Sequence, residues 1–418
     1  MAFFTDPSIF GLDISDHSIE CLLLTKGVGK IYLKSYSRVE LAPGIVENGV
    51  ILDKKKLSQL IVEALSKARP KKITSKKVIF SLPESRTFIH IFKSSEIPKG
   101  TKLKEEMVFE AAKIIPLELK EIYNDFTRYE NGDILFAASP KKIVNDYLEV
   151  MKNAGLKTVA LDIESLSIGR AMLTSGGLKE SFMVADIGAR FTNLSIFDKY
   201  GLLRVSSTIK IAGNKFSRAL ARELNLYIEK AEKLKQTYGL DVEKGDKKVV
   251  AVLEREISPI IEKIRELLAY YHKEVKKILL VGGSAQMPKI ASYFSKKLNI
   301  NTELGKSKIA SQFKKESVLY ENVIGLALRG LEEKPAEAGI NLLPPIFKKK
   351  PLLQLFLQRR IKLWIAITFL IIEALLFLAG VKTIFNELDR IMKGIKINIE
   401  QIDIMEQKLQ DGRIKVID

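Results

Sequence analysis

Residues 182–197 read FMVADIGARFTNLSIF: an apolar run, a polar turn that begins at Asp186, and a second apolar run. Residues 9–24 follow the same plan, because IFGL leads into Asp13 and the chain leaves the turn through IECLLL. Each stretch predicts a β-hairpin. Two facing hairpins of this kind can hold a nucleotide, because the N–H groups of their turns surround phosphate oxygens and the two aspartates face a hydrated Mg²⁺. One such turn alone would more often be an ordinary hairpin.

Strand and helix patterns alternate from residue 8 to residue 330, which predicts an α/β architecture. Residues 78–92 suggest two strands around a proline turn, followed by a helix at 104–116, a strand at 133–140 and a helix at 141–155. This run predicts a small α+β subdomain. Residues 331–351 are rich in proline, glycine and charge, and therefore predict a linker.

Composition excludes several classes of function. Hydrophobic residues make up 46% of 418, so the chain can bury a large core. A formal charge of +18 suits nucleic acid or an anionic membrane, but no RNP motif, helix-turn-helix or arginine-rich run supports nucleic acid. The single cysteine excludes a disulfide framework. No Walker A, GxGxxG, GxSxG, HxxxH or CxxC motif is present, which argues against a P-loop enzyme, a Ser-His-Asp hydrolase and a zinc site.

One segment has the composition of a membrane span. Residues 363–381 read LWIAITFLIIEALLFLAGV, long enough to cross the hydrocarbon layer. Basic residues at 348–350 and 359–362 precede it, which predicts a span at 362–382 with its N-terminal side in the cytoplasm. We therefore expect a single-pass inner-membrane protein, mostly cytoplasmic, whose basic stretch lies against anionic lipid and whose short tail lies outside. Glu373 is costly at that depth and is expected to face a partner helix.

The tail carries a heptad pattern. Seam residues recur at spacings of three and four: Leu388, Ile391, Ile395, Asn398, Ile402, Met405 and Leu409. This pattern predicts a short coiled-coil helix within 383–418, with one polar position that fixes register. An amphipathic helix packed on another element is the alternative. Either structure requires a partner.

Two further motifs lie between the second hairpin and the linker. Residues 276–290 read KKILLVGGSAQMPKI, a strand followed by Gly282, Gly283 and Ser284. Paired glycines let the backbone approach a flat ligand closely, and a helix N-terminus after them favours anions. Residues 231–239 read AEKLKQTYG, which puts Glu232 and Lys235 on adjacent turns of one helix. Taken alone, the first motif also fits a plain connection and the second a solvated helix face.

Together and in this order, these four elements resemble the actin-like ATPase superfamily, whose two lobes clamp ATP. The resemblance narrows to FtsA-like proteins and, among them, to the family of the type IV pilus assembly protein PilM. It extends to the strings GLDIS, FEAAKIIPLEL, AGLKTVALDIESLSIGRAML and ENVIGLALRG. It implies a two-lobed, ribonuclease-H-like fold over residues 1–335, with an inserted subdomain at about 79–155 and a second lobe at about 180–317. Its implied ligands are ATP or ADP and Mg²⁺.

The resemblance also implies roles for single residues. Asp13 and Asp186 would face the metal through water, while Glu164 is a weak candidate for positioning the attacking water. Phosphate would be approached by Ser15, Ser18, Gly188 and Thr192, the adenosine by Gly282, Gly283 and Ser284, and the ribose by Glu232 and Lys235. The turns depart from the family pattern at Asp16, His17, Arg190 and Phe191, where small residues are typical. We therefore expect nucleotide binding with at most weak ATPase activity, and Arg190 paired with a phosphate.

The linker carries a motif of its own. Residues 339–345 read GINLLPP, which resembles the cytoplasmic N-terminal peptide of PilN, the membrane partner of PilM. With the basic stretch and membrane helix that follow, the chain resembles a PilM–PilN fusion with a linker at 336–361. An extended peptide can bind a groove through backbone hydrogen bonds. The candidate partner-binding residues, on the same or a neighbouring copy, are Ile340, Asn341, Leu342, Leu343 and Pro344. An unbound linker is the alternative.

The resemblance implies a scaffold of type IV pilus assembly that couples PilB- and PilC-like motor components to periplasmic alignment proteins. A PilO-like protein would contact the transmembrane and heptad helices, since no PilN-like globular periplasmic domain follows. Homo-oligomerisation is a further expectation. The alternatives are a GspL-like type II secretion scaffold, an FtsA-like cell-division filament protein and, from another class, a true ATPase such as a chaperone or sugar kinase.

Overall fold

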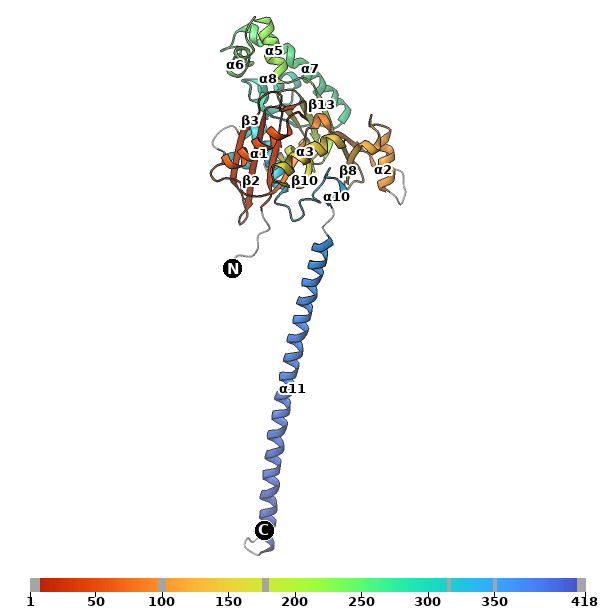
Figure 1. Ribbon diagram of the computed structural model, residues 1–418, viewed down its shortest axis with the longest axis vertical. Coiled ribbons are helices and arrows are strands. Elements are labelled where there is room, and N and C mark those ends of the chain that lie inside the picture. The colour runs from red at the N-terminus through yellow and green to blue at the C-terminus, as the bar shows by residue number, and fades with distance from the viewer. Residues whose placement is uncertain (1–7, 97–102, 175–179, 314–316, 349–351, 412–418) are drawn as a thin grey trace. The chain divides into compact units, whose positions relative to one another are not determined.

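The computed structural model describes residues 8–96, 103–174, 180–313, 317–348 and 352–411. The chain divides into two compact units, Met1–Pro344 and Pro345–Asp418 (Figure 1). The first unit holds all the β-sheets of the described residues, and the second is helical. The boundary falls before the last residue of the predicted peptide motif, so residues 336–344 belong to the globular unit.

The first large sheet contains both strands of the first predicted hairpin. Its strands are β1 (Phe10–Ile14), β2 (Ser18–Lys26), β3 (Ile31–Glu40), β6 (Lys77–Leu82) and β10 (Lys157–Ile163), in the order β10-β6-β1-β2-β3. The β1–β2 and β2–β3 pairs are antiparallel, whereas β1–β6 and β6–β10 are parallel. The hairpin is therefore confirmed as β1 and β2.

The second large sheet repeats this plan strand for strand. Its strands are β11 (Phe182–Ile187), β12 (Thr192–Phe197), β13 (Leu203–Ile209), β14 (Lys277–Val281) and β15 (Asn301–Leu304), in the order β13-β12-β11-β14-β15. Antiparallel pairs again join the first three strands, and parallel pairs join the last two. As a result, β1 and β11 hold equivalent central positions, and each carries its aspartate as the penultimate residue.

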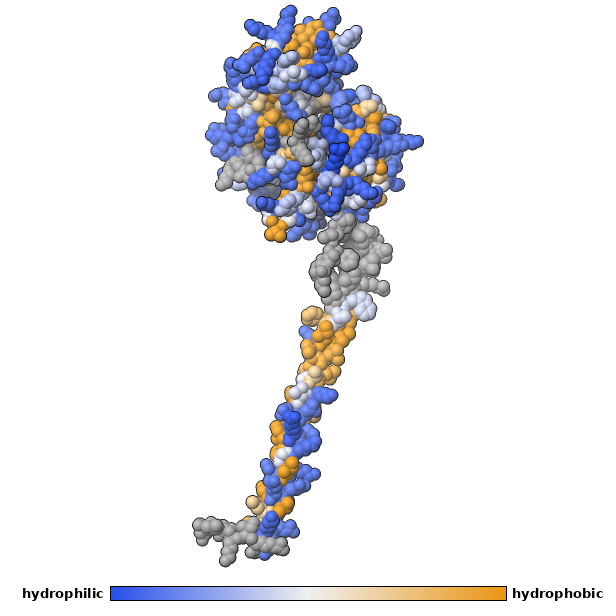
Figure 2. Space-filling view, turned by 90° about the vertical axis from the view of Figure 1, so that its left-hand side faces the viewer, coloured by the Kyte–Doolittle hydropathy of each residue, from blue (hydrophilic) through white to orange (hydrophobic). Residues whose placement is uncertain are grey.

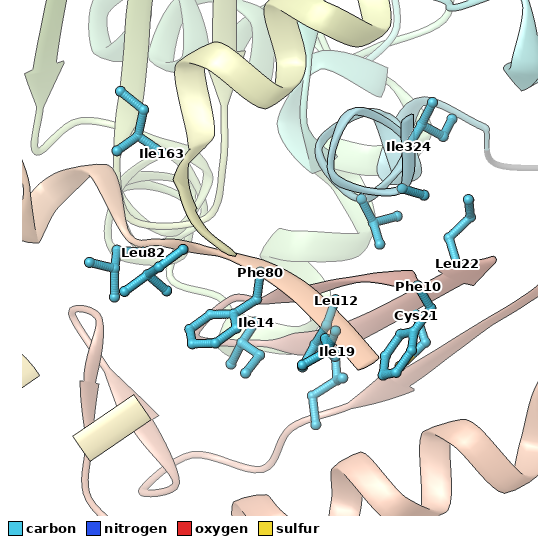
Figure 3. Close-up of a cluster of buried hydrophobic side chains, with 14 of the residues drawn as sticks. Phe10, Leu12, Ile14, Ile19, Cys21, Leu22, Phe80, Leu82, Ile163 and Ile324 are labelled. Carbon is cyan, nitrogen blue, oxygen red and sulfur yellow. The ribbon is translucent and has the colours of Figure 1, made fainter. Parts of the chain in front are cut away.

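Helices cover both sheets. On the first sheet lie α1 (Lys54–Lys67), α3 (Lys141–Asn153), α4 (Glu164–Leu173) and α9 (Glu321–Arg329); the second lobe carries α5 (Gly213–Glu223), α6 (Ile228–Thr237), α7 (Lys247–Tyr271) and α8 (Ile290–Leu298). Figure 3 shows Ile324 of α9 above strands whose buried side chains include Phe10, Leu12 and Phe80. The two-lobed α/β fold predicted from the sequence is confirmed.

Two glycines allow α9 to lie unusually close to its neighbours. A Cβ atom at Gly11 of β1 would lie 2.6 Å from the carbonyl oxygen of Val323, and one at Gly325 would lie 1.7 Å from the carbonyl oxygen of Ser167 in α4. Real Cβ atoms do not approach backbone this closely, so both positions require glycine. The helix is therefore held against β1 and α4 by direct backbone contact, and all nine of its residues are buried.

A third, small sheet forms the inserted subdomain. It contains β7 (Phe88–Phe92), β8 (Ile122–Arg128) and β9 (Ile134–Pro140) in the antiparallel order β7-β9-β8, and α2 (Leu103–Ala112) supplies Met107 and Ala111 to its core. Strands β7 to β9 span Phe88–Pro140, which lies within the predicted range of 79–155. Of the elements at the ends of that range, β6 pairs into the first large sheet and α3 packs on α1, so both belong to the first lobe.

The second unit consists of α10 (Pro345–Lys348) and α11 (Leu352–Gln410). Helix α11 has 59 residues and is therefore about 88 Å long. Its apolar part is long enough to cross a membrane by length and composition, and it runs without interruption into the heptad region (Figure 2). The seam residues Leu388, Ile395 and Leu409 are exposed. Residues 349, 350 and 412–418 of the predicted basic stretch and tail lie outside the described residues.

Candidate functional site

One cavity of about 230 Å³ brings the two predicted hairpin turns together. Residues 13–18 of the first turn and residues 188–191 of the second both line it, as do the carboxylates of Asp13 and Asp186. These residues come from different lobes, so the cavity lies between them. The sequence-based expectation that the two turns face each other is met by this arrangement.

Among the carboxyl groups that line the cavity, Glu20 and Glu84 are buried, and Asp13, Glu164 and Asp186 are half-buried. Burial raises the pKa of Asp13 to about 6, and burial together with the charge of Asp13 raises the pKa of Asp186 to about 7. For the same two reasons the pKa of Glu164 lies well above its ordinary value and that of Glu20 rises to about 7. Burial likewise raises the pKa of Glu84. The carboxyl groups therefore repel one another when ionised, and a cation among them would relieve that repulsion.

This donor set fits a hydrated divalent cation. In the part of the chain that the structure describes, no three carboxylate, histidine or cysteine side chains stand close enough to form a direct metal cage. Mg²⁺ usually keeps several waters and takes one or two carboxylates together with substrate phosphates. Asp13 and Asp186 could hold such an ion through water, as the resemblance implies.

The first turn uses its own serine to satisfy its backbone. Ser15 Oγ accepts hydrogen bonds from the N–H groups of His17 (3.2 Å) and Ser18 (3.0 Å), and the N–H of Ser15 donates to the carbonyl of Ser18 at 2.9 Å. Ser18 is buried, while Ser15 is exposed at the cavity mouth. A phosphate could accept hydrogen bonds from the N–H groups of His17 and Ser18 only by displacing the Ser15 hydroxyl.

Asp16 and Arg190 join the two turns directly. Arg190 Nε lies 3.1 Å from Asp16 Oδ2, and the same carboxylate accepts hydrogen bonds from the N–H groups of Asn48 (2.8 Å) and Gly49 (3.0 Å). Asp16 is thus fixed by its own lobe, and Arg190 reaches it from the other. Arg190 was expected to pair with a phosphate; in this structure it pairs with Asp16 instead.

The residues predicted from the second turn do not all line the cavity. Gly188 lines the cavity, and its carbonyl accepts a hydrogen bond from Ser284 Oγ at 2.8 Å. Thr192 is buried and donates its hydroxyl to the carbonyl of Ile211 at 2.6 Å, so it does not line the cavity as expected. The next residue, Asn193, does line it and donates to Glu164 Oε2 at 3.1 Å.

A second, larger cavity adjoins the first and shares five lining residues with it: His17, Arg38, Ala189, Gly283 and Leu319. Glu232 and Lys235 meet here, with Lys235 Nζ 2.7 Å from Glu232 Oε2. Lys235 is buried and also donates to Ser217 Oγ (3.0 Å). Gly283 and Ser284 also line this cavity, whereas Gly282 lines only the first. Of the residues assigned to ribose and adenosine, all but Gly282 therefore lie around one cavity.

Gly282 has the sharpest steric requirement in the site. Its φ of +88° is in the range that favours glycine, and an added Cβ would lie 2.3 Å from Asp186 Oδ1. The strand β14 consequently ends directly beside the carboxylate of β11. Gly283 follows at the start of the short 3-10 helix η4 (Gly283–Gln286) and lines both cavities.

Among the polar residues of the site that were not singled out from the sequence are Glu84, Asn193 and Asn322. Glu84 accepts from the N–H of Ser165 (2.8 Å), and its own N–H donates to Glu164 at 3.2 Å. Asn322 of α9 hydrogen-bonds Asp13, and its Nδ2 donates to Ser81 Oγ at 3.1 Å. Asn193 is the cross-strand partner of Asp186. Alternation along the strand could have identified Asn193, whereas Glu84 and Asn322 reach the site through packing of distant segments.

The GINLLPP segment is docked on its own chain. Ile340, Asn341, Leu342 and Leu343 are at most 3% exposed. The N–H of Leu342 donates to the carbonyl of Leu161 (2.9 Å), and the N–H of Leu161 donates to Asn341 Oδ1 (3.0 Å). Because Leu161 belongs to β10, the edge strand of the first sheet, the segment covers that edge.

Arg329 at the end of α9 donates hydrogen bonds to the backbone of this segment and of the loop that precedes it. Its guanidinium is completely buried and donates to the carbonyls of Ile340 (2.6 Å) and Pro335 (2.8 Å). It also lies 2.9 Å from Asp162 Oδ2, which Arg170 of α4 approaches to 3.2 Å. Burial opposes ionisation of Asp162, but the two arginines hold its pKa below the ordinary value.

Comparison with known proteins agrees with this geometry. The family model of the type IV pilus assembly protein PilM matches residues 11–331. The chain belongs to the PilM family. The match covers both lobes, the inserted subdomain and α9, so the fold and the family were both identified from the sequence.

More distant relatives are cell-division proteins. FtsA of Neisseria meningitidis serogroup B is 25% identical over 187 residues, which cover 39% of this chain and 45% of that protein. FtsA of Enterococcus hirae is 26% identical over 224 residues, which cover 48% of this chain and 49% of that protein. The PilM-family chain thus spans about half the length of these curated relatives.

Solved structures share the fold. A chain of the PilM–PilN type IV pilus biogenesis complex has a TM-score of 0.67 at 23% identity, covering 78% of this chain and 99% of that one. The ethanolamine utilization protein EutJ of Carboxydothermus hydrogenoformans has a TM-score of 0.51 at 18% identity, covering 78% and 90%. Both likenesses establish the two-lobed actin-like ATPase fold.

Proposed function

We propose that this PilM-family chain is a nucleotide-binding inner-membrane scaffold of type IV pilus assembly, which binds ATP or ADP with Mg²⁺ between its lobes. The observation that carries the proposal is the pair Asp13 and Asp186, contributed by equivalent strands of the two lobes to one cavity. The adjoining cavity has Glu232, Lys235 and Ser284 on its walls. The first cavity suits phosphates and a cation, and the second suits a nucleoside.

Each group has a defined task in this proposal. Asp13 and Asp186 hold the hydrated cation, which supplies positive charge to the phosphates. The turns at residues 15–18 and 188–191 supply N–H donors, and Arg190 can exchange Asp16 for a phosphate oxygen. Glu232 and Lys235, already paired, offer an acceptor and donors to ribose hydroxyls. Gly283 lets a flat base approach the backbone.

Titration of the full-length chain in nanodiscs with fluorescent ATP tests this site. We expect binding in the micromolar range that requires Mg²⁺ and weakens at least tenfold in Asp13→Asn, because one of two cation-facing carboxylates is lost. Asp403→Asn, an exposed position on α11, is the matched control and should bind as the natural chain does. Binding that is indifferent to both Mg²⁺ and Asp13→Asn would place the nucleotide elsewhere.

Hydrolysis is expected to be slow. Glu164 is the best placed carboxylate for orienting water, but it accepts hydrogen bonds from Glu84 N–H and Asn193, and its pKa is raised by burial and by Asp13. A carboxyl group that already accepts two hydrogen bonds is poorly placed to take a proton from water. Phosphate release should stay well below about 1 s⁻¹, the low end of ordinary enzyme rates. Faster turnover would favour a true ATPase over a scaffold.

The GINLLPP segment gives the proposal its link to the membrane. We propose that it acts as a PilN-type peptide carried on the same chain, so that a separate PilN is not needed to fill the groove beside β10. Support comes from the burial of Ile340 and Leu342 and from the solved complex that contains PilM and PilN. A synthetic GINLLPP peptide should bind the natural chain poorly and a chain truncated after residue 335 well.

We also propose a membrane topology and outer partners on the basis of α11. Its apolar part would cross the inner membrane with the lobes in the cytoplasm, its basic flank near anionic lipid, and its heptad region outside against a PilO-like protein or a second copy. PilB- and PilC-like motor components would meet the cytoplasmic lobes. Because the natural Cys21 is buried, a single added cysteine reports topology. Glu400→Cys should react with an impermeant maleimide from outside, and Lys244→Cys only after lysis.

A further inference from the structure

Arg38 carries the permanent positive charge on the wall that the two cavities share. The described residues that line both cavities are His17, Arg38, Ala189, Gly283 and Leu319. Burial lowers the pKa of His17, so its imidazole is uncharged at neutral pH. Among these shared residues, Arg38 is therefore the cation at the point where a ligand would pass from the second cavity into the first.

The register of the first sheet explains why Arg38 faces the site. Asp13 of β1 pairs with Glu20 of β2, and Glu20 pairs with Arg38 of β3. Paired residues of neighbouring strands have their side chains on the same face of a sheet, so these three form one row. All three line the first cavity. The row therefore places a guanidinium two strands away from the aspartate that is proposed to face the cation.

Glu20 fixes one edge of this guanidinium and leaves the other edge unused. Arg38 Nε donates to Glu20 Oε1 at 2.8 Å, and the side chain of Glu20 is only 4% exposed. A guanidinium carries five N–H donors in a rigid fork, and this bond uses one of them. Arg38 Nη1 lies 3.9 Å from the exposed Glu40, which is too far for a hydrogen bond. Neither Nη1 nor Nη2 therefore donates to a residue that the structure describes.

The position of Arg38 assigns it to one part of the ligand. In the proposed function, the nucleoside lies in the second cavity, and the phosphates and the cation lie in the first. The phosphate groups next to the nucleoside must then pass the shared wall. ADP and ATP both carry these groups, whereas adenosine has none. Arg190 lines the first cavity but not the second, so it lies beyond this junction.

We propose that Arg38 binds the phosphate groups next to the nucleoside, and that Glu20 is the residue that positions it. This inference rests on the proposed function, because it assigns a residue within that site. Charge-assisted hydrogen bonds from a guanidinium to phosphate are short and strong, and the two Nη atoms can donate to two oxygens at once. Since Glu20 already holds Nε, the side chain has little freedom left to lose on binding. The site thus selects diphosphates and triphosphates alike over the free nucleoside.

Calorimetric titration of the full chain in nanodiscs with ADP and with ATP, each with Mg²⁺, tests this assignment. The double variant Glu20→Gln/Arg38→Gln leaves no lone buried carboxylate, and it should bind both nucleotides about ten- to a hundredfold more weakly, by equal factors. The affinity for adenosine, measured by displacement of fluorescent ATP, should change less than twofold. Arg38→Lys keeps the charge without the fork and should bind ADP at least threefold more tightly than the double variant. Arg128→Gln, exposed on β8, is the matched control and should bind as the natural chain does.

Three results would overturn the inference while the proposed function stands. ADP affinity of the double variant within twofold of the natural chain would mean that Arg38 does not touch phosphate. An equal loss for adenosine would mean that the pair only shapes the cavity, and a larger loss for ATP than for ADP would place Arg38 at the terminal phosphate. Should adenosine displace no probe even from the natural chain, the recovery in Arg38→Lys decides. A natural chain that binds neither ADP nor ATP would instead refute the proposed function itself.

Discussion

The substitution Asn341→Ala should loosen the docked segment by a measurable and calculable amount. Asn341 Oδ1 accepts hydrogen bonds from the N–H groups of Leu161 (3.0 Å) and Leu343 (3.2 Å), and its Nδ2 donates to the carbonyl of Ala336 at 3.0 Å. Alanine removes all three bonds. The N–H groups of Leu161 and Leu343 then stay buried without an acceptor, which costs about 1–3 kcal/mol each.

The total of about 3 kcal/mol corresponds to a change of roughly two orders of magnitude in the opening equilibrium. Amide exchange in β10 should therefore be about a hundredfold faster in Asn341→Ala, as measured by mass spectrometry on the full chain in nanodiscs. Lys334→Ala, whose side chain is 75% exposed, is the matched control. Exchange within threefold of the natural chain would mean that Asn341 does not hold the segment, and the assignment of the groove would be refuted.

Asn341→Asp refines the same measurement. An aspartate keeps an acceptor for the N–H of Leu161 but cannot donate to Ala336, and it brings a second carboxylate near Asp125, which accepts from the N–H of residue 341 at 2.8 Å. We therefore expect faster exchange in β10 above pH 6 than at pH 4 once the intrinsic pH dependence of exchange is subtracted. Equal corrected rates at both pH values would show that charge has no part in docking.

Three further perturbations test other parts of the molecule. Gly282→Ala should abolish nucleotide binding, because its Cβ would lie 2.3 Å from Asp186 Oδ1; binding within twofold of the natural chain would contradict this steric account. Asp16→Asn should free Arg190 and tighten ATP binding severalfold in a fluorescence titration, and weaker binding would mean that their 3.1 Å pair helps to form the site. The nucleotide-free protein should melt at lower temperature as pH rises from 5 to 8 in differential scanning fluorimetry. The folded pKa values of Asp13 and Asp186, about 6 and 7, exceed their unfolded values, so the stability that their protonated forms contribute is lost across that window, and a flat profile would contradict it.

Local pattern in the sequence was enough to find the parts of the site that lie on strand ends. Asp13 and Asp186 follow apolar runs that predict strands, and Gly282 follows a third such run. Strand alternation also explains the error at Thr192: its neighbour Asn193, paired in register with Asp186, faces the cavity. The prediction chose Thr192 for its hydroxyl group and did not take into account that side chains alternate between the two faces of a strand.

Other features depend on segments that meet only after folding. Asn322 reaches Asp13 because two glycines let α9 approach β1 and α4 closely. No local sequence pattern predicts this close approach. The bounds of the inserted subdomain are hard to predict for a related reason. Residues 79–155 read as a continuous run of elements, yet the pairing partner of β6 is β1, about 70 residues earlier, which sequence order does not reveal.

The matching strand order of the two large sheets has a consequence for charge. When two lobes built to one plan face each other, equivalent positions meet, and equivalent positions carry like charges: Asp13 opposite Asp186. Two such lobes cannot be electrostatic complements at their centre, however well their shapes agree. Arg38 and Arg190 also line this cavity, but Arg190 is already paired with Asp16. In the proposed function, the cation that arrives with the nucleotide would balance Asp13 and Asp186, so the fit between the two lobes would depend on what is bound between them.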